Sequence, residues 1–199
     1  MQADPKKWEK EIAAFEAADR KRFPRPGGIV FVGSSTIRMW KSLDKDFPGY
    51  GTLNRGFGGS QLPDSTHFAP RILRPYQPRQ IVLFAGTNDI NAKRTPPQVA
   101  QDFSDFVLTV RSLLPRTRLS FIELTSSPSR WAQRDAVVET NRIIQRLCQR
   151  NGVDFIPVRE KLFGPSREPR PELFITDKLH LNADGYKILA EAVRPFLSR

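Results

Sequence analysis

Short apolar runs alternate with longer amphipathic stretches along most of the chain, and this alternation restricts the fold more than any other sequence feature. A short, continuously apolar run is typical of a strand buried on both faces, as in a parallel sheet covered by helices. Five runs indicate strands, at residues 29–32, 52–54, 81–85, 119–124 and 153–158. The alternation predicts an α/β fold with a mostly parallel, five-stranded sheet covered by helices on both faces.

The expected helices repeat apolar residues at three- and four-residue steps. These residues span positions 8–15, 99–114, 137–148 and 186–197. Pro115 and Gly152 mark two helix ends, because proline cannot continue a helix and glycine favours its C-terminus. Asn182 is a suitable N-cap for the last helix, since its side chain can accept hydrogen bonds from the first free N–H groups.

The chain has 199 residues, enough for one compact domain with its own core. A hydrophobic content of 39% and a charged content of 27% are typical of folded globular proteins. No linker, internal repeat or low-complexity segment interrupts the pattern. We therefore expect a single domain over residues 1–199, with an N-terminal helix within residues 1–24 packed on it.

Several classes of protein are disfavoured by what the sequence lacks. The lone cysteine, Cys148, excludes an internal disulfide framework, and two histidines are too few for a histidine-rich zinc site. No stretch approaches the roughly 20 apolar residues of a membrane span, and no apolar signal segment is visible. We expect no metal, cofactor or membrane span. The chain as written is expected to be cytoplasmic, or exported if a signal peptide preceded it.

The net charge of +11, with an isoelectric point near 10.3, raises the alternative of a nucleic-acid or anionic-polymer binder. The arginines, however, are scattered from Arg20 to Arg199 without long basic runs. No nucleic-acid motif accompanies them, so we expect no specific nucleic-acid partner and a generally basic solvated surface.

Four short polar blocks carry the functional signal. They are Gly33-Ser34-Ser35, residues 54–59, residues 86–89, and residues 177–180 just before the last helix. The first three each follow an expected strand. In parallel sheets ligands bind outside the carboxyl ends of the strands, so these three blocks are expected at one edge of the sheet.

Together the blocks supply the parts of an acyl-transfer site. Ser35 is the candidate nucleophile, His180 the candidate base, and Asp177 the carboxylate that orients the imidazole. The backbone N–H of Gly59 and the side-chain amide of Asn88 are candidate donors to an oxyanion.

Each block also has a simpler structural interpretation. Ser35 and its neighbour can cap a helix, the glycine-rich loop can be a plain turn, and Asn88 can form an Asx-turn at a strand end. His180 alone would be an ordinary surface histidine. The joint order of the blocks favours the site. His67 is expected to be solvated or structural, and Asp89 to hold its loop rather than react.

From about residue 29 to the C-terminus, the blocks resemble the signature of the SGNH hydrolases, also called the GDSL esterase/lipase family. The branch of platelet-activating-factor-acetylhydrolase-like esterases is the most similar. The resemblance implies a flavodoxin-like, three-layer α/β/α sandwich without a cofactor. It also implies that Ser35, His180 and Asp177 form the triad, and that the Ser35 N–H joins Gly59 and Asn88 in an oxyanion hole.

Two positions depart from the family pattern. Ser34 stands where the family usually has aspartate before the nucleophile, and Ser60 stands where a carboxylate is frequent. Relatives with Gly-Ser-Ser followed by Ile-Arg-x-Trp resemble this segment, so we expect Ser35 to remain the nucleophile. The hydrogen bonds of the nucleophile turn are expected to differ.

The predicted function is hydrolysis of short-acyl esters, above all acetyl esters, of small molecules or carbohydrates through an acyl-enzyme. Arg130 and Trp131 follow the fourth expected strand and are candidates for contact with the alcohol part of the substrate. The alternative for this segment is a capped helix start with a packed tryptophan. The alternative functions are an inactive carbohydrate-binding protein of the same fold and, less favoured, the anionic-polymer binder.

Overall fold

Five parallel strands form one sheet in the computed structural model, which describes residues 5–198. The strands are β1 (Ile29–Gly33), β2 (Thr52–Gly56), β3 (Gln80–Phe84), β4 (Arg118–Ile122) and β5 (Val153–Ile156). Their order in the sheet is β2-β1-β3-β4-β5, and every neighbouring pair is parallel. The expected five-stranded sheet is confirmed, with the flavodoxin-like strand order. Residues 1–4 and 199 of the expected domain lie outside the described residues.

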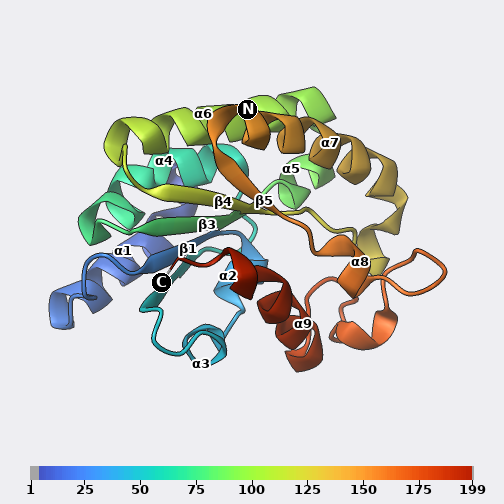
Figure 1. Cartoon of the computed structure of the whole chain (residues 1–199), viewed down its shortest axis with the longest axis horizontal. Coiled ribbons are helices and arrows are strands. Elements are labelled where there is room, and N and C mark those ends of the chain that lie inside the picture. Colours follow the sequence, from blue (N-terminus) through green and yellow to red (C-terminus); the bar gives the residue numbers. More distant parts are fainter. Residues whose placement is uncertain (1–4, 199) are drawn as a thin grey trace.

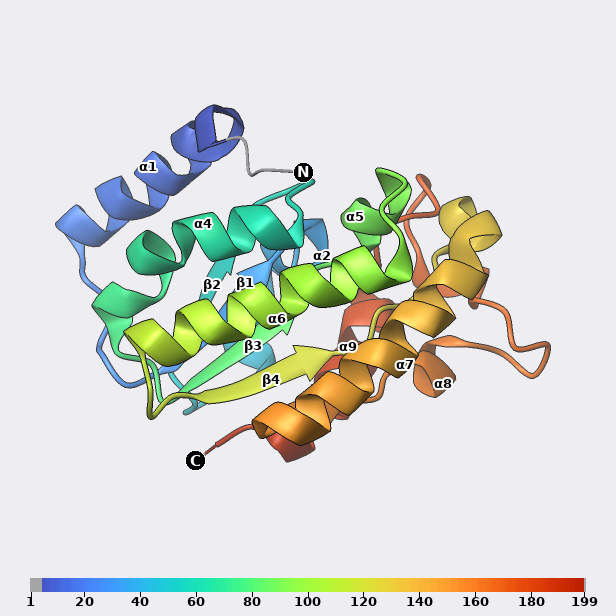
Figure 2. The same cartoon turned by 90° about the horizontal axis from the view of Figure 1, so that it is seen from above.

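Helices cover both faces of this sheet (Figure 1). One face carries α1 (Pro5–Lys21), α4 (Leu62–Ile72), α6 (Pro96–Leu113) and α7 (Arg134–Asn151), which lie side by side in Figure 2. The other face carries α2 (Ser35–Arg38), α3 (Leu43–Asp46), α8 (Arg159–Leu162) and α9 (Ala183–Val193). The short α5 (Thr87–Asn91) follows β3, and 3-10 turns occupy η1 (Arg74–Tyr76), η2 (Pro128–Gln133), η3 (Pro171–Leu173) and η4 (Arg194–Phe196). The three-layer α/β/α architecture is therefore confirmed.

Aromatic side chains fill the space between the layers. Phe31 of β1 lies 5.6 Å from both Trp40 and Phe47, measured between ring centroids. Phe121 of β4 packs edge-on against Phe103 of α6 at 5.0 Å. All five of these aromatic side chains are buried, and β1 and β3 are buried along their whole length. The two-sided burial explains why these strands read as continuous apolar runs.

Some expected boundaries were wrong by a few residues. β5 ends at Ile156 instead of residue 158, because Pro157 has no N–H for the ladder. β4 ends at Ile122 instead of residue 124, where the side chain of Asn141 takes both the N–H and the carbonyl of Leu124. The last helix ends at Val193, and the chain continues as the 3-10 turn η4 instead of a helix to residue 197.

The strand order reverses between β1 and β3. The chain leaves β1 towards β2 on one side, whereas β3 leads to β4 and β5 on the other. In an open parallel sheet the crevice at such a reversal, outside the carboxyl ends of the strands, is the usual ligand site. Ser35 lies two residues after the end of β1, and Asn88 lies four residues after the end of β3, within α5, so the fold brings these two predicted site residues to that crevice.

Candidate active site

The turn after β1 exposes Ser35 at the start of α2. Gly33 has φ +139°, and a Cβ at this position would lie 2.0 Å from the carbonyl oxygen of Phe84. The Ser34 N–H donates to that oxygen at 3.1 Å, while the Ser34 carbonyl accepts from Ile37 and Arg38. Ser34 makes no side-chain capping bond to α2. The turn therefore does not use its first serine hydroxyl as a helix cap.

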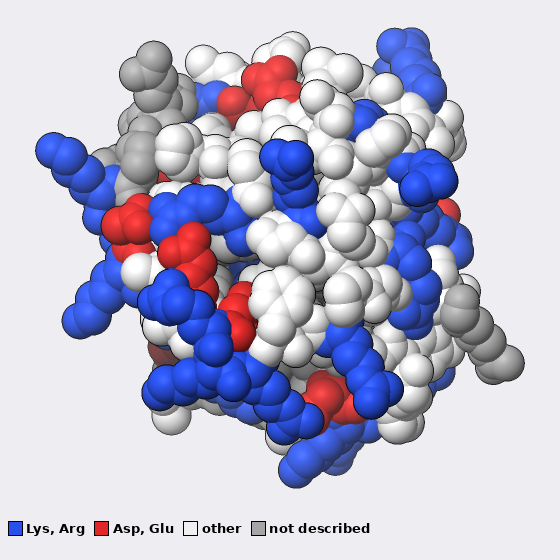
Figure 3. All heavy atoms as spheres, turned by 90° about the vertical axis from the view of Figure 1, so that its left-hand side faces the viewer, with Lys and Arg blue, Asp and Glu red and all other residues white. Residues whose placement is uncertain are grey.

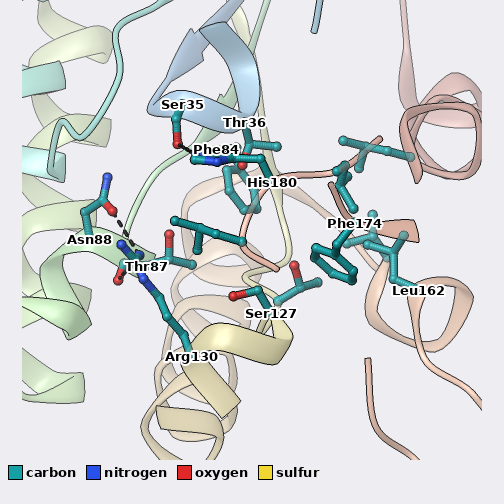
Figure 4. A pocket seen from close by; sticks show the side chains of 15 residues that line it. Ser35, Thr36, Phe84, Thr87, Asn88, Ser127, Arg130, Leu162, Phe174 and His180 are labelled. Atoms are coloured by element: carbon teal, nitrogen blue, oxygen red, sulfur yellow. Dashed lines mark hydrogen bonds between the residues drawn. The ribbon is translucent and has the colours of Figure 1, made fainter. Parts of the chain in front are cut away.

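Ser35, His180 and Asp177 form one hydrogen-bonded chain, of which Figure 4 shows the contact between Ser35 and His180. His180 Nε2 lies 2.9 Å from Ser35 Oγ, and His180 Nδ1 lies 2.6 Å from Asp177 Oδ2. Because a carboxylate only accepts, Nδ1 carries the proton and Nε2 is free to accept from the serine hydroxyl. The structure thus brings together the three residues of the expected triad in the order that the chemistry requires.

The carboxylate of Asp177 is also held by backbone groups. Its Oδ1 accepts from the N–H of Leu179 at 2.8 Å and from the N–H of His180 at 3.0 Å. Burial tends to raise the pKa of Asp177, but the hydrogen bonds from the His180 ring and from the two N–H groups outweigh it and hold this pKa at about 2. Asp177 is therefore ionised across the neutral range.

The three expected oxyanion donors each keep at least one N–H hydrogen that no acceptor among the described residues uses. Among residues 5–198, no acceptor pairs with the backbone N–H of Ser35 or with that of Gly59. Asn88 Nδ2 donates one hydrogen to the carbonyl of Ser60 at 3.0 Å, which leaves its second hydrogen unused. These are the groups expected to bind an oxyanion.

The loop after β2 is held by side chains of the second block. Asn54 donates to the carbonyl of Ile37 at 2.5 Å and accepts from the Gly56 N–H at 2.9 Å. Ser60, which replaces the carboxylate frequent in the resembling family, is buried and donates to the carbonyl of Phe57 at 2.8 Å. The serine at position 60 therefore stabilises the loop through an internal hydrogen bond.

Asp89 holds the loop after β3, as predicted. It is fully buried and accepts from the N–H of Leu62 at the start of α4, at 3.1 Å. Burial raises the pKa of Asp89 to about 7; the hydrogen bond from Leu62 and the charge of Arg94 oppose this, and the nearby Asp102 adds to it. No contact joins Asp89 to Ser35 or His180 among the described residues.

A small cavity of about 40 Å³ opens beside the triad. Ser35, His180, Asn88 and Arg130 line it together with apolar side chains, among them Phe84, Val158, Leu162, Phe174 and Leu181 (Figure 4). Sequence patterns did not identify the apolar residues that line this cavity. Phe174 lies in an irregular segment without periodicity, so the one available signal was its closeness in sequence to Asp177.

The two candidate substrate contacts differ in position. Arg130 lines the cavity, and its Nη1 donates to Asn88 Oδ1 at 2.9 Å and to the Thr87 carbonyl at 3.3 Å. Trp131 is not among the residues that line the cavity; its ring packs edge-on against Phe163 at 5.9 Å between centroids. His67 is exposed on α4 with its ring against Phe68, away from the triad.

Between residues 5 and 198, no three histidine, cysteine, aspartate or glutamate side chains gather as metal ligands would. No helix in the same range has the length and apolar character to cross a membrane.

Comparisons with known proteins concern the family and the fold. The model of the GDSL-like Lipase/Acylhydrolase family matches residues 32–188, which include all four blocks. No curated protein matches the sequence.

Solved structures with the same fold are numerous. A Streptococcus pneumoniae protein named for platelet activating factor is 21% identical, over 96% of this chain and 94% of that chain, with a TM-score of 0.79. A GDSL-like lipase from Bacteroides thetaiotaomicron is 17% identical over 98% and 97%, with a TM-score of 0.75. An acetyl xylan esterase is 17% identical over 86% and 100%, with a TM-score of 0.71. At these identities, the structures establish the shared fold.

Proposed function

The chain belongs to the GDSL-like lipase/acylhydrolase family and is an ester hydrolase, and we propose that it cleaves short-acyl esters, above all acetyl esters, with Ser35 as nucleophile. The observation that carries this proposal is the continuous hydrogen-bonded chain from Ser35 through His180 to Asp177, at 2.9 and 2.6 Å. An inactive carbohydrate-binding relative would have no need of this arrangement.

In the first half-reaction, Ser35 Oγ attacks the ester carbonyl carbon while His180 Nε2 takes the hydroxyl proton. Asp177 holds the Nδ1–H and stabilises the imidazolium that forms. The carbonyl oxygen becomes an oxyanion, which the N–H groups of Ser35, Gly59 and Asn88 stabilise. The C–O bond to the alcohol then breaks, His180 protonates the leaving alcohol, and the acyl group remains on Ser35.

The second half-reaction repeats these steps with water. His180 takes a proton from water as it attacks the acyl carbon, the same donors stabilise the second oxyanion, and the bond to Ser35 Oγ breaks. Ser35 recovers its proton from His180 and the carboxylic acid leaves. No residue outside the triad and the oxyanion donors is required to move a proton.

The size of the cavity supports a short acyl group. It has about 40 Å³ beside Ser35, and one water needs roughly 10–15 Å³ of such space. An acetyl group, with three heavy atoms counting the carbonyl, fits this space, whereas a long acyl chain would have to displace the partly buried Phe174 or the buried Leu181.

Acetylated carbohydrate is the first natural substrate class to test, because one protein of the same fold is an acetyl xylan esterase. In this proposal Arg130 and Trp131 lie on the side of the alcohol. Trp131 would stack on a sugar ring, as aromatic side chains can, if the substrate extends from the cavity towards η2.

The test replaces Ser35 with alanine and measures release of p-nitrophenol from esters of rising acyl length, together with acetate release from acetylated xylan. We expect Ser35→Ala to lose at least about 10⁴-fold in kcat, as removal of a triad nucleophile does, and the acetate ester to be the best p-nitrophenyl substrate of the wild type. Ser104→Ala, on α6, is the control for loss of a serine hydroxyl away from the site. A folded Ser35→Ala variant with unchanged turnover would refute the proposal.

A further inference from the structure

Arg130 lines the catalytic cavity with a charged side chain that has no acidic partner. Among the described residues, no carboxylate forms an ion pair with it. Burial lowers the pKa of Arg130 without an opposing carboxylate, yet an arginine keeps its charge in such surroundings. Because no counter-charge compensates the partial burial of this cation, the position of Arg130 indicates a role other than ion pairing.

The contacts of Arg130 all lead to the loop that carries Asn88. Its Nη1 donates to Asn88 Oδ1 at 2.9 Å and to the carbonyl of Thr87 at 3.3 Å (Figure 4). The turn that carries Arg130 is itself tied to the catalytic loop, because the N–H of Ser129 donates to the carbonyl of Lys178 at 3.0 Å. The guanidinium is therefore held between the loop of the base and the loop of the oxyanion donor.

The amide of Asn88 has two ends of similar shape and opposite hydrogen-bonding character. Arginine can only donate, so it pairs with Oδ1, and the Ser60 carbonyl can only accept, so it pairs with Nδ2. The two partners fix the amide in one of its two orientations. Without Arg130, Asn88 Oδ1 would have no hydrogen bond from Arg130 to lose if the amide rotated by half a turn. The rotated amide would then direct its oxygen, instead of an N–H, at the oxyanion.

We propose that Arg130 is a positioning residue for ester hydrolysis: it binds Asn88 Oδ1 so that the second Nδ2 hydrogen of Asn88 faces the oxyanion. This inference rests on the proposed function. A charged donor at Oδ1 gives a stronger hydrogen bond than a neutral one and also polarises the amide, which makes its N–H a better donor to the oxyanion. The role differs from contact with the alcohol part of the substrate, since Arg130 acts through Asn88.

A double-mutant cycle on a neutral acetate ester tests this role. We expect Arg130→Met to lower kcat by at least about tenfold, but by no more than the roughly 10²- to 10³-fold loss expected for Asn88→Ala, with little change in KM. In the Asn88→Ala background, Arg130→Met should change kcat by less than about twofold, because residues that act as a unit are not additive. Arg130→Gln serves the same cycle if Arg130→Met does not fold, and Arg146→Gln, exposed on α7, controls for loss of a positive charge.

Two kinetic outcomes would overturn the proposal. Multiplicative losses in the double variant would mean that Arg130 acts independently of Asn88. A rise in KM at constant kcat, or a loss confined to esters with a negatively charged alcohol part, would make Arg130 a substrate contact instead.

A second measurement separates this inference from the proposed function. The side-chain amide hydrogens of Asn88, assigned by nuclear magnetic resonance from their absence in Asn88→Ala, should exchange with water faster in Arg130→Met than in the wild type or in Arg146→Gln. Unchanged exchange would contradict the positioning role even in a chain that hydrolysed no ester. Ser35-dependent turnover, measured on the wild type and Ser35→Ala alone, decides the proposed function.

Discussion

At the scale of single residues, Asp177 shows how local hydrogen bonds can orient a carboxylate, here the one proposed for the triad. One carboxylate oxygen takes two backbone N–H groups of the following residues, and the other takes the imidazole of His180. The side chain is 42% exposed, yet these bonds fix its orientation without a buried environment. Lys178, at φ +55°, makes the tight turn that places both N–H groups beneath the carboxylate.

Replacing Asp177 with asparagine should lower kcat by up to about 10⁴-fold, because the amide no longer holds the imidazole in the required tautomer. The pKa of Asp177 at about 2 also predicts the pH profile of the wild type. Between pH 4 and 8 this carboxylate stays ionised, so proton uptake by Asp177 should contribute nothing to any fall of kcat/KM with decreasing pH in that range. Asp184→Asn, exposed on α9, is the control. An acid limb that requires two protons would contradict this assignment.

At the scale of elements, α1 supports the loop that carries Gly59. The Trp8 ring packs edge-on against Phe57 at 5.8 Å, and its Cη2 atom lies 3.2 Å from where a Cβ on Gly59 would be. Arg71 of α4 pairs with Glu9 and Glu16 of α1, and Arg55 of β2 pairs with Asp19. The helix is thus fixed to α4 and β2 while its tryptophan backs one oxyanion donor.

Trp8→Ala should therefore affect both stability and catalysis. Removal of a buried tryptophan side chain costs about 3–5 kcal/mol of unfolding free energy, and kcat of the folded enzyme should fall because the Gly59 loop loses its support. Ile12→Ala is the matched control: it is buried in the same helix and should cost about 2–5 kcal/mol with kcat unchanged. Denaturant unfolding and steady-state kinetics measure the two effects. Equal kcat in both variants would show that α1 does not position the loop.

Asp89 joins β3 and α4, and its raised pKa of about 7 makes this junction sensitive to pH. The pKa of Asp89 is higher in the folded than in the unfolded protein. The contribution of Asp89 to the unfolding free energy is therefore fully present at low pH and is lost as the pH rises through about 7. Asp89→Asn keeps an acceptor for the Leu62 N–H. Its unfolding free energy, relative to that of the wild type, should rise by a few kcal/mol between pH 5 and pH 8. Chemical denaturation at both pH values gives this difference. A difference in unfolding free energy that does not change with pH would contradict the shift.

At the scale of the whole molecule, the sequence predicted what depends on local pattern. β1 and β3 were recognisable because both of their faces are buried, and the four blocks were recognisable because each follows a strand or precedes a helix. β2 was predicted too short because its residue Arg55 is charged. The Arg55 side chain can be buried only because it donates hydrogen bonds to Asp19 and Tyr76, which are distant from it in the sequence. The contact of Arg130 with Asn88 crosses 42 positions, and no periodicity reports such a pairing.

The distribution of charge also belongs to the whole molecule. Lys and Arg side chains cover more of the face in Figure 3 than Asp and Glu do, beside a wide uncharged area, and this face lies at the amino ends of the strands. A cavity lined by Arg22, Phe23 and Arg25 opens beside Gly28 and Gly51, ahead of β1 and β2. The catalytic cavity lies at the opposite ends of the strands.

We therefore expect a polyanion such as heparin to bind at low ionic strength, to dissociate by about 0.3 M salt as screening shortens the range of the charges, and to leave turnover of a neutral ester unchanged. Combined Arg22→Gln and Arg25→Gln replacements should weaken this binding without changing kcat. Salt titration of heparin retention and a parallel activity assay measure both. Inhibition of ester hydrolysis by heparin would show that the two faces are not independent.

The wide separation of the triad along the chain has a consequence for protein synthesis. Ser35 is synthesised before β2, whereas Asp177 and His180 follow β5, and α9 contacts α2 through the hydroxyl of Tyr186, which donates to the Thr36 carbonyl at 2.8 Å. A ribosome-bound chain can therefore pair all five strands while it still has no base. Under the proposed mechanism, hydrolysis begins only after residues 177–193 have emerged and docked, so a chain terminated before Asp177 that still folds its sheet should have no ester-cleaving activity.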